Sequence, residues 1–382
     1  MSKLIIPHLI ALDSSTIGNV ARDLYGSNQH NQGKARHLLD CISLKNLIPL
    51  VTWHHIEELL QHEDDAVIDN RICFIKNLPM VAWFDTVKPS GIIGTIMDIQ
   101  AIELSWLISN PSTSFEEIIQ KTKDKLLKFG TGRDLISIYD MTIWKQIMKR
   151  TAPIRQNRRR EIASISHAKI GGSETKKPIN FSNWQLRNHE EAEKVVETLK
   201  TNLEKDLVNR GDKKLSDHKT VAQEFIKDVY KDGLHLYHNR GDVRENFLKS
   251  FGLSPEEIPD KASIEDIGYA AIFRKKLKIL AEILDINEDS FKTIKEDHCP
   301  SWLIWKELDK VLKSDDRTYG SNITDKYLAV LALYADFLIV DKRIHEKFNQ
   351  VVRRNAVIKK VITNVVKLSD YGNISEALGC TE

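Results

Sequence analysis

The chain has 382 residues, of which 41% are hydrophobic and 29% are charged, and this balance is that of an ordinary soluble globular protein long enough for two domains. Its formal net charge of +2 neither excludes nor demonstrates a nucleic-acid partner, because binding depends on where the charge is placed. Its four cysteines lack zinc-site spacing, and no apolar segment is long enough for a signal peptide or a membrane span, so we expect a reduced, cytoplasmic protein without a membrane partner.

Four short apolar runs predict buried strands, because each is rich in β-branched residues or leucine and is too short for an independent helix. In chain order these runs are Leu9–Leu12, Ile48–Thr52, Phe337–Val340 and Val361–Val366. The segments beside them have helical periodicity, at Ala35–Leu47, Trp53–Gln61 and Thr324–Ala335. Strands that alternate with helices imply a mainly parallel sheet with helices on both faces.

The middle of the chain has a helical pattern instead. The clearest predicted helices are Phe115–Phe129, His189–Leu207, Thr220–Tyr230 and Ile267–Ile286. The basic, glycine-containing stretch Arg155–Lys177 predicts a loop or linker. We therefore expect an α/β fold in which residues 1–95 and 318–382 form one discontinuous domain, interrupted by an α-helical insertion at residues 96–317. Such an insertion costs little, because the entropy of loop closure grows slowly with loop length.

Two predicted strands end directly in a carboxylate, since Asp13 follows the first and Asp341 the third. Ligands bind at the carboxyl ends of parallel strands, so these acids converge if the strands are neighbours. Glu58, on the helix after the second strand, lies opposite that helix's apolar stripe, and Asp325 begins the helix before the third strand. Converging carboxylates need a cation, and oxygen ligands suit Mg²⁺ or Mn²⁺. Such an ion activates water for attack on a phosphodiester.

These residues resemble the PIN-like nuclease family in three places. The matching segments are LIALDSS, VTWHHIEELL and SNITDKYLAVLALYADFLIVDKRIHEKF. The last is the most specific, because it joins an Asp at a helix start, an Ala-rich helix, an "AD" pair, an apolar strand and an Asp followed by a basic residue. The tail VITNVVKLSDYGNISEAL is similar to the family's closing strand and helix. The resemblance covers residues 1–95 and 318–382 and implies a divalent-metal nuclease that cuts RNA more often than DNA.

The resemblance also implies a set of site residues. By position, the family's four acids, which are both catalytic and metal-binding, fall on Asp13, Glu58, Asp325 and Asp341. Its small hydroxyl residues near the metal fall on Ser14 and Thr52. Because Glu57 and Glu58 are adjacent, either of them could be the acid that the family has on this helix. A toxin or defence role, and a regulatory protein or second copy as partner, are implied by the resemblance alone. The long insertion is not typical of the small PIN toxins.

Each predicted acid also has a structural alternative. The two strand-end acids could cap turns, Asp325 could be a first-turn acid stabilised by the helix dipole, and Glu58 could be solvated. The order, spacing and strand-end placement of the four acids favour the site. His54 and His55 lack a further His or Cys at ligand spacing, so a core or solvated position is their better interpretation.

The stretch Lys145–Arg160 is the most basic in the chain, and arginine and lysine neutralise backbone phosphates. Its candidate nucleic-acid-binding residues are Lys145, Lys149, Arg150, Arg155, Arg158, Arg159 and Arg160. The alternative is a solvated helix end and linker. At the level of function, the alternatives to a nuclease are a catalytically weak PIN-like adaptor that binds RNA or a protein through its insertion, and a purely structural helical protein.

Overall fold

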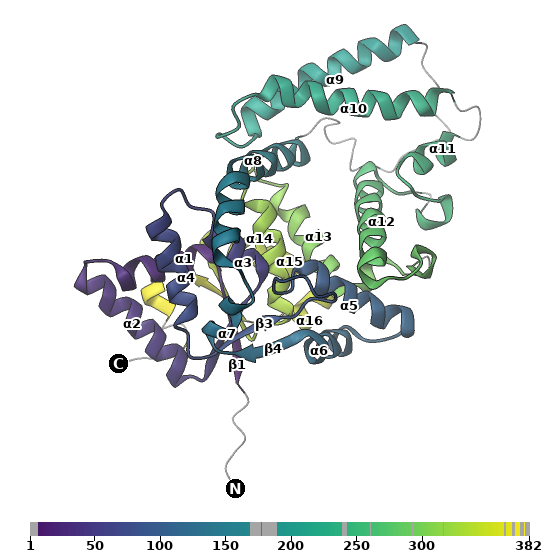
Figure 1. The fold of residues 1–382 in the computed structure, drawn as a ribbon. Coiled ribbons are helices and arrows are strands. Elements are labelled where there is room, and N and C mark those ends of the chain that lie inside the picture. Colours follow the sequence, from purple (N-terminus) through teal and green to yellow (C-terminus); the bar gives the residue numbers. More distant parts are fainter. Residues whose placement is uncertain are drawn as a thin grey trace.

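The computed structural model describes residues 7–168, 189–238, 243–259, 261–291, 294–315, 317–362, 364–368 and 371–374, with the single residues 177 and 378. It is a mixed α/β molecule built on one six-stranded sheet that carries helices on both faces (Figure 1). This confirms the predicted fold class at that level. Among the helices in the described ranges, none combines the length and the hydropathy that crossing a membrane would need.

The sheet has the strand order β4-β3-β2-β1-β5-β6. The strands are β1 (His8–Leu12), β2 (Leu47–Val51), β3 (Val81–Phe84), β4 (Leu127–Gly130), β5 (Phe337–Asp341) and β6 (Asn364–Leu368). All neighbouring pairs are parallel except β3 and β4, which are antiparallel. The pairing of β1 with β5 aligns Leu12 with Ile339, so the two strands from opposite ends of the chain finish at the same edge.

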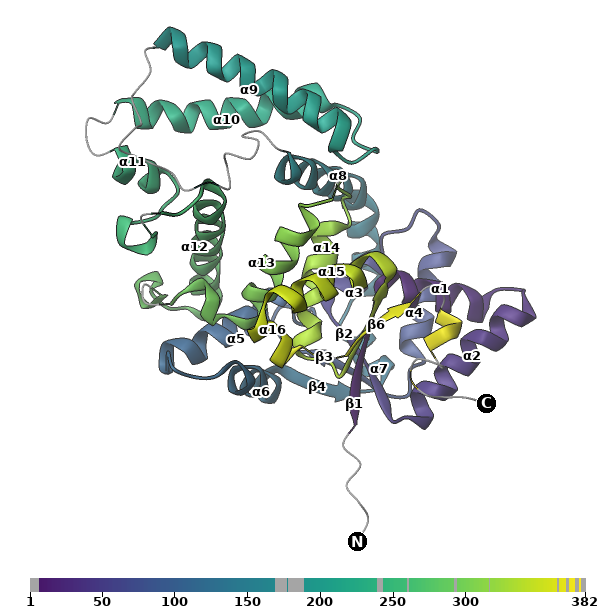
Figure 2. The ribbon, with the colours of Figure 1, turned by 180° about the vertical axis from the view of Figure 1, so that it is seen from behind.

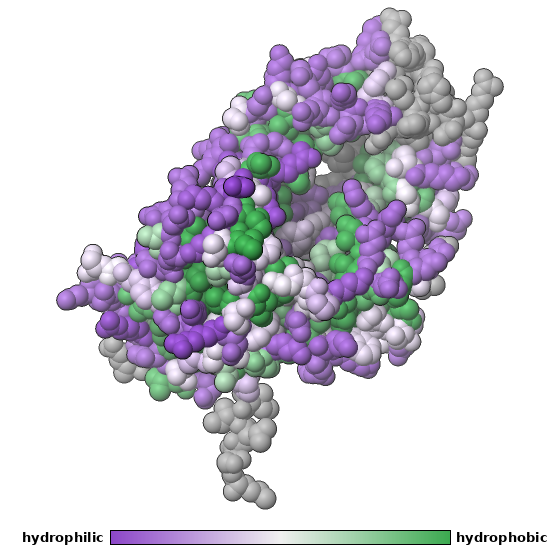
Figure 3. Space-filling view, viewed as in Figure 1, coloured by the Kyte–Doolittle hydropathy of each residue, from purple (hydrophilic) through white to green (hydrophobic). Residues whose placement is uncertain are grey.

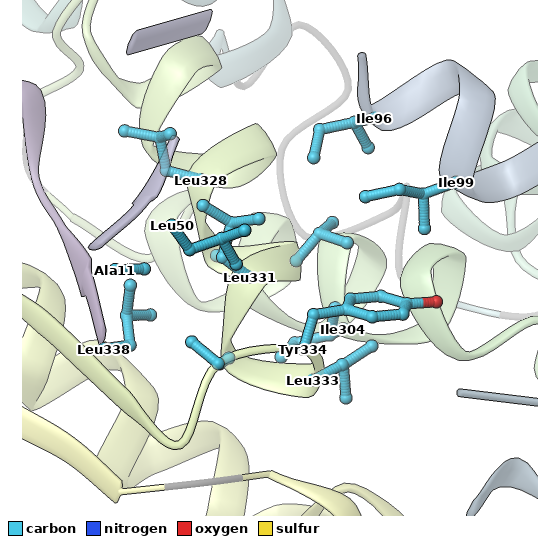
Figure 4. Close-up of a cluster of buried hydrophobic side chains, with 14 of the residues drawn as sticks. Ala11, Leu50, Ile96, Ile99, Ile304, Leu328, Leu331, Leu333, Tyr334 and Leu338 are labelled. Atoms are coloured by element: carbon cyan, nitrogen blue, oxygen red, sulfur yellow. The ribbon is translucent and has the colours of Figure 1, made fainter. Parts of the chain in front are cut away.

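Side chains alternate between two cores because successive residues of a strand point to opposite faces of the sheet. One face packs on α1 (Ser14–Tyr25), α2 (Gln29–Leu44), α3 (Trp53–Leu59), α4 (Asp65–Lys76), α7 (Gly132–Ser137) and α8 (Met141–His167). The other packs on α5 (Ile96–Ser109), α6 (Phe115–Leu126), α13 (Pro300–Leu312), α14 (Asn322–Ala329), α15 (Lys342–Arg354) and α16 (Ala356–Val361). In the second core, Ala11 and Leu50 of the sheet face Leu328 and Leu331 (Figure 4).

The remaining helices stand away from the sheet. They are α9 (His189–Arg210), α10 (His218–His238), α11 (Val243–Ser250) and α12 (Ile264–Leu284). Both ribbon views show α9 and α10 lying alongside each other beyond α8, and α12 returning the chain toward α5 and α13 (Figures 1 and 2). A core that includes Ala101, Tyr269, Phe273 and Trp302 joins α12 to α5 and α13.

The sheet is larger than the sequence pattern predicts. The apolar run Val81–Phe84 forms β3, and Leu127–Gly130 forms β4, although the pattern assigns Phe115–Phe129 to a single helix. Backbone pairing with β3 ends that helix at Leu126. Because β4 lies inside residues 96–317, the sheet extends past the expected boundary of the insertion. The division into two domains stays a prediction.

Three local predictions are wrong. Residues 155–167 are not a linker, because α8 continues through Pro153 to His167 and buries Ala163 and Ser164; residues 169–176 lie outside the described part. The last strand begins at Asn364 rather than at position 361, since α16 extends to Val361. Cys73 and Cys299 are free thiols, but Cys41 is disulfide-bonded. The expectation that all cysteines are reduced is therefore wrong for Cys41.

Candidate active site

Two of the predicted acids lie at the shared carboxyl edge of the neighbouring strands β1 and β5. The Asp13 backbone N–H donates to the Ile339 carbonyl at 3.2 Å, and Asp341 is the last residue of β5. Neighbouring parallel strands lie about 4.8 Å apart, so the Asp13 and Asp341 side chains leave the backbone close enough for both carboxylates to reach the same point. Each also caps a helix: Asp13 accepts from the Ser15 N–H at 3.2 Å, and Asp341 accepts from the Ile344 N–H at 2.7 Å.

The third acid, Asp325 of α14, faces the same edge. It lines one pocket together with Asp13 and Asp341. Burial, and then the negative charges of Asp13, Asp341 and Glu58, raise the pKa of Asp325 to about 7, while Arg343 acts in the opposite direction. The four predicted acids therefore share one electrostatic environment despite their separation in the sequence.

The two adjacent glutamates of α3 lie in different surroundings. Glu58 is half-buried; burial raises its pKa, as does the nearby Asp13, while the Ser14 and Thr324 hydroxyls lower it. Glu57 is buried and accepts hydrogen bonds from Arg155 at 2.7 Å and Arg159 at 3.0 Å. Although burial acts to raise the pKa of Glu57, His54 and the two arginines hold it at about 2. Glu58 is thus the glutamate that reaches the acidic edge.

Arg343 supplies the positive charge that balances this edge. Its guanidinium donates to Asp325 Oδ2 and to Asn322 Oδ1, both at 2.6 Å, and lies 5.1 Å from the centre of the Tyr319 ring. Sequence reasoning missed this residue, although its position two residues after Asp341 placed it near the site. The arginine lets the acids coexist, because an ion pair favours the charged form of Asp325.

The donor set fits Mg²⁺ or Mn²⁺ by chemistry, since all of its atoms are oxygens. The buried Ser14 hydroxyl lies near Glu58 but makes no hydrogen bond of ordinary geometry with any described residue, which leaves a polar atom at this edge to be satisfied. As the side chains stand, however, no three His, Cys, Asp or Glu residues of the described chain are grouped closely enough to hold an ion. Asp325 is turned toward Arg343, and both Asp13 oxygens bond Ser15. A closed ligand set requires these carboxylates to turn.

Thr52 lies behind the acidic edge rather than on it. Its backbone N–H donates to His55 Nδ1 at 3.0 Å, so His55 carries its proton on Nε2 and donates it to the Leu12 carbonyl at 2.9 Å. Burial lowers the pKa of His55 to about 4, which keeps the ring neutral. Thr52 and His55 therefore hold the end of β1, directly before Asp13. Of the two positions expected for this histidine, core or solvated, the structure has the core one.

The predicted basic stretch does not form one continuous surface. Lys145 and Lys149 pair with Asp69 and Asp65 of α4, and Arg158 pairs with Glu161 of its own helix. Arg155 and Arg159 turn toward Glu57, beside the acidic edge. Arg160 packs against Gly320. Neither Arg150 nor Arg160 forms an ion pair with any described residue. Of this stretch, the arginines paired with Glu57 lie nearest to the acids.

Compared with protein families, with curated proteins and with solved structures, the chain matches none of them.

Proposed function

We propose that this protein is a PIN-like, metal-dependent nuclease that hydrolyses phosphodiester bonds, with RNA expected in preference to DNA. The observation that carries the proposal is the convergence of Asp13, Asp341 and Asp325 on one pocket at the carboxyl edge of the sheet, with Glu58 in the same electrostatic environment. Burial, together with repulsion from the neighbouring acids, raises the pKa of Asp325, and a bound cation would offset the repulsive part of this cost.

The four acids would hold Mg²⁺ or Mn²⁺, which supplies a water of low pKa and neutralises charge on the phosphate. The protein's own groups favour an anion at the same place. The N-termini of α1 and α15 begin directly after Asp13 and Asp341, so their positive dipole ends point to this edge. Arg343, released from Asp325, would be free to donate to a phosphate oxygen.

A catalytically weak adaptor is the second candidate. The observation that favours it is the present pairing of Asp325 with Arg343, which lets the acidic edge persist without an ion. Such a protein would bind RNA or a protein through its helical part and would not need the metal.

Cleavage of labelled RNA and DNA with Mn²⁺, and with EDTA, tests the nuclease proposal. We expect EDTA to abolish cleavage, and Asp13→Asn and Asp341→Asn to reduce it by about a hundredfold or more, because the loss of a metal ligand should exceed the tenfold to hundredfold effect of an outer-shell change. Asp64→Asn is the matched control, because Asp64 caps α4 in the same way, accepting from the Ala66 N–H at 2.8 Å, but away from the pocket.

The control variant should cleave as well as the wild type. Cleavage that survives EDTA, or that is unchanged in both site variants, refutes the nuclease proposal. Calorimetric titration with Mn²⁺ separates the two candidates: a protein that binds RNA but takes up no Mn²⁺ at the acidic edge is the adaptor.

A further inference from the structure

Lys276 of α12 is a half-buried cation with no anion of the described chain to balance it. Its Nζ lies 5.0 Å from the centre of the Trp302 ring, 4.9 Å from that of Trp305 and 5.6 Å from that of Tyr327. Among the described residues, its one hydrogen bond is to Gln100 Oε1 at 3.5 Å, the limit for such a bond. The aromatic faces attract the ammonium group, but they neutralise no charge.

The neighbouring Lys326 lies in the same environment, but its charge is paired with a carboxylate. Lys326 lies 4.8 Å from the centre of the Trp305 ring and pairs with Asp309 at 2.5 Å. Lys276 has no such carboxylate, and its burial lowers its pKa to about 8. Buried charges in proteins are normally paired. Lys276 is an exception among the described residues, and an anion that they do not supply would pair it.

Two side chains that contact Lys276 each carry a buried donor without a described acceptor. These donors are Trp305 Nε1 and Gln100 Nε2; Gln100 contacts Lys276 through its Oε1 atom, and the ammonium group lies over the Trp305 ring. Unsatisfied buried groups in a native structure need an explanation. An unpaired lysine whose neighbouring side chains carry two further donors suits a ligand that is anionic and rich in acceptor oxygens, as a phosphate is.

A line of aromatic and basic side chains joins this place to the acidic edge. Tyr327 lies two residues after Asp325, and the His54 ring stacks on it with centres 5.0 Å apart and an interplanar angle of 8°. Arg159 is close enough to act against the rise that burial causes in the pKa of both Tyr327 and Glu58. Figure 3 shows the molecule hollowed between α12 and the body that carries α14, and these side chains come from elements on the two sides of that hollow.

We propose that this line is a subsite for single-stranded nucleic acid, in which Lys276 binds a backbone phosphate and the Tyr327–His54 stack holds a base. This subsite proposal rests on the proposed function, because only a nuclease site at the acidic edge would place a scissile phosphodiester next to Asp325. A single strand is the form that fits, because its bases are free to stack on aromatic side chains whereas those of a duplex stack on one another.

Binding measured in EDTA tests the subsite without cleavage. The probes are fluorescent single-stranded RNA and DNA of about 12 nucleotides, a length within the range that single-strand sites cover, and the matching duplexes, followed by anisotropy. The variants are Lys276→Met and Tyr327→Leu. Lys278→Met, at an exposed position of the same helix, and Tyr327→Phe, which keeps the ring, are the controls.

We expect Lys276→Met and Tyr327→Leu each to weaken single-strand binding by about tenfold, as the loss of one stacked base or phosphate contact does elsewhere. Lys276→Met should also reduce the slope of log affinity against log salt by about 0.7. Both controls should stay within about twofold of the wild type, well below the change that one lost contact causes. We also expect the wild type to bind the single-stranded probes more tightly than the matching duplexes.

The subsite is refuted if single-strand affinity is unchanged in both variants, if duplexes bind equally well, or if the wild type binds neither RNA nor DNA. Because EDTA is present, the outcome is independent of catalysis. Binding that depends on Lys276 in a protein that never cleaves would remove the nuclease proposal and keep the subsite. Metal-dependent cleavage with unchanged single-strand affinity in both variants would remove the subsite and keep the nuclease proposal.

Discussion

Glu57 and Glu58 differ by one position in the sequence and by the charge that surrounds them in the fold. Successive residues of a helix point about 100° apart, so one faces α8 and the other faces the end of β1. Glu57 meets Arg155 and Arg159, which hold its pKa at about 2 against the effect of burial. Glu58 meets Asp13 and two hydroxyls, and its pKa is raised. Glu57 is therefore suited to anchoring α8 through its arginines, and Glu58 is suited to binding a cation.

Substitution separates these roles. Glu57→Gln removes the charge that two arginines share, and we expect it to lower the free energy of unfolding by about 2 kcal/mol while metal-dependent cleavage persists. Glu58→Gln should change stability by less than about 1 kcal/mol, because its surroundings already favour the neutral form, and should reduce cleavage by tenfold or more. Urea unfolding and cleavage assays measure both. Loss of cleavage confined to Glu57→Gln would reverse the assignment.

At the scale of elements, His55 joins α3 to the end of β1. The ring accepts from Thr52 at the start of α3 and donates to Leu12, the residue before Asp13. It is buried and neutral, so a proton added to it breaks the bond from the Thr52 N–H and places a charge in the core. The position of Asp13 therefore depends on a histidine from another element.

This contact predicts how stability varies with pH. The pKa of His55 is lowered to about 4 in the folded chain, so below the ordinary value of 6.5 the unfolded chain binds a proton that the folded chain does not. Stability from this group is complete above pH 6.5 and falls as the pH decreases toward 4, by up to about 3 kcal/mol. Urea unfolding at several pH values measures it.

His55→Gln removes the titrating group and serves as the comparison. Its unfolding free energy should be lower at pH 7.5 and should vary less between pH 6.5 and 4 than that of the wild type. Identical pH profiles for the two proteins would show that His55 is not the group responsible.

At the scale of the whole molecule, Glu103 holds together three segments that are far apart in the sequence. This fully buried carboxylate of α5 accepts hydrogen bonds from Tyr334 Oη at 2.5 Å, Ser301 Oγ at 2.6 Å, the Ser301 N–H at 3.1 Å and Cys299 Sγ at 3.0 Å. Ser301 begins the helix that follows α12, and Tyr334 lies before β5. Glu103 thus ties α13 to α5 and to the segment before β5.

Glu103→Leu should be among the most destabilising single substitutions in the chain. It leaves the Ser301 and Tyr334 donors buried without an acceptor, and we expect a loss of about 3 kcal/mol or more, with a smaller loss for Glu103→Gln. Glu116→Gln, on the exposed face of α6, is the control and should change little. Thermal and urea unfolding give the values. A loss below about 1 kcal/mol for Glu103→Leu would contradict this account, because each unsatisfied donor alone should cost as much.

Local sequence was sufficient for the parts of the fold whose signal is local. A buried strand needs only a short apolar run, and a residue that ends such a strand lies at the sheet edge whatever the rest of the chain does. This is why β1, β2 and β5, and with them Asp13 and Asp341, were predicted within one or two residues. The β3 run Val81–Phe84 carried the same signal and was missed.

Other features depend on partners that periodicity does not report. Leu127–Gly130 continues a helical pattern, yet it becomes β4 because the edge of β3 offers it backbone hydrogen bonds. The basic stretch lies within α8, where two of its arginines bind Glu57. Asp325 meets Arg343, and Lys276 meets Tyr327, only once the elements pack. The sequence by itself determined which segments are buried and where the strand-end acids lie. Only the tertiary structure decided the electrostatic partners, because charges interact through space rather than along the chain.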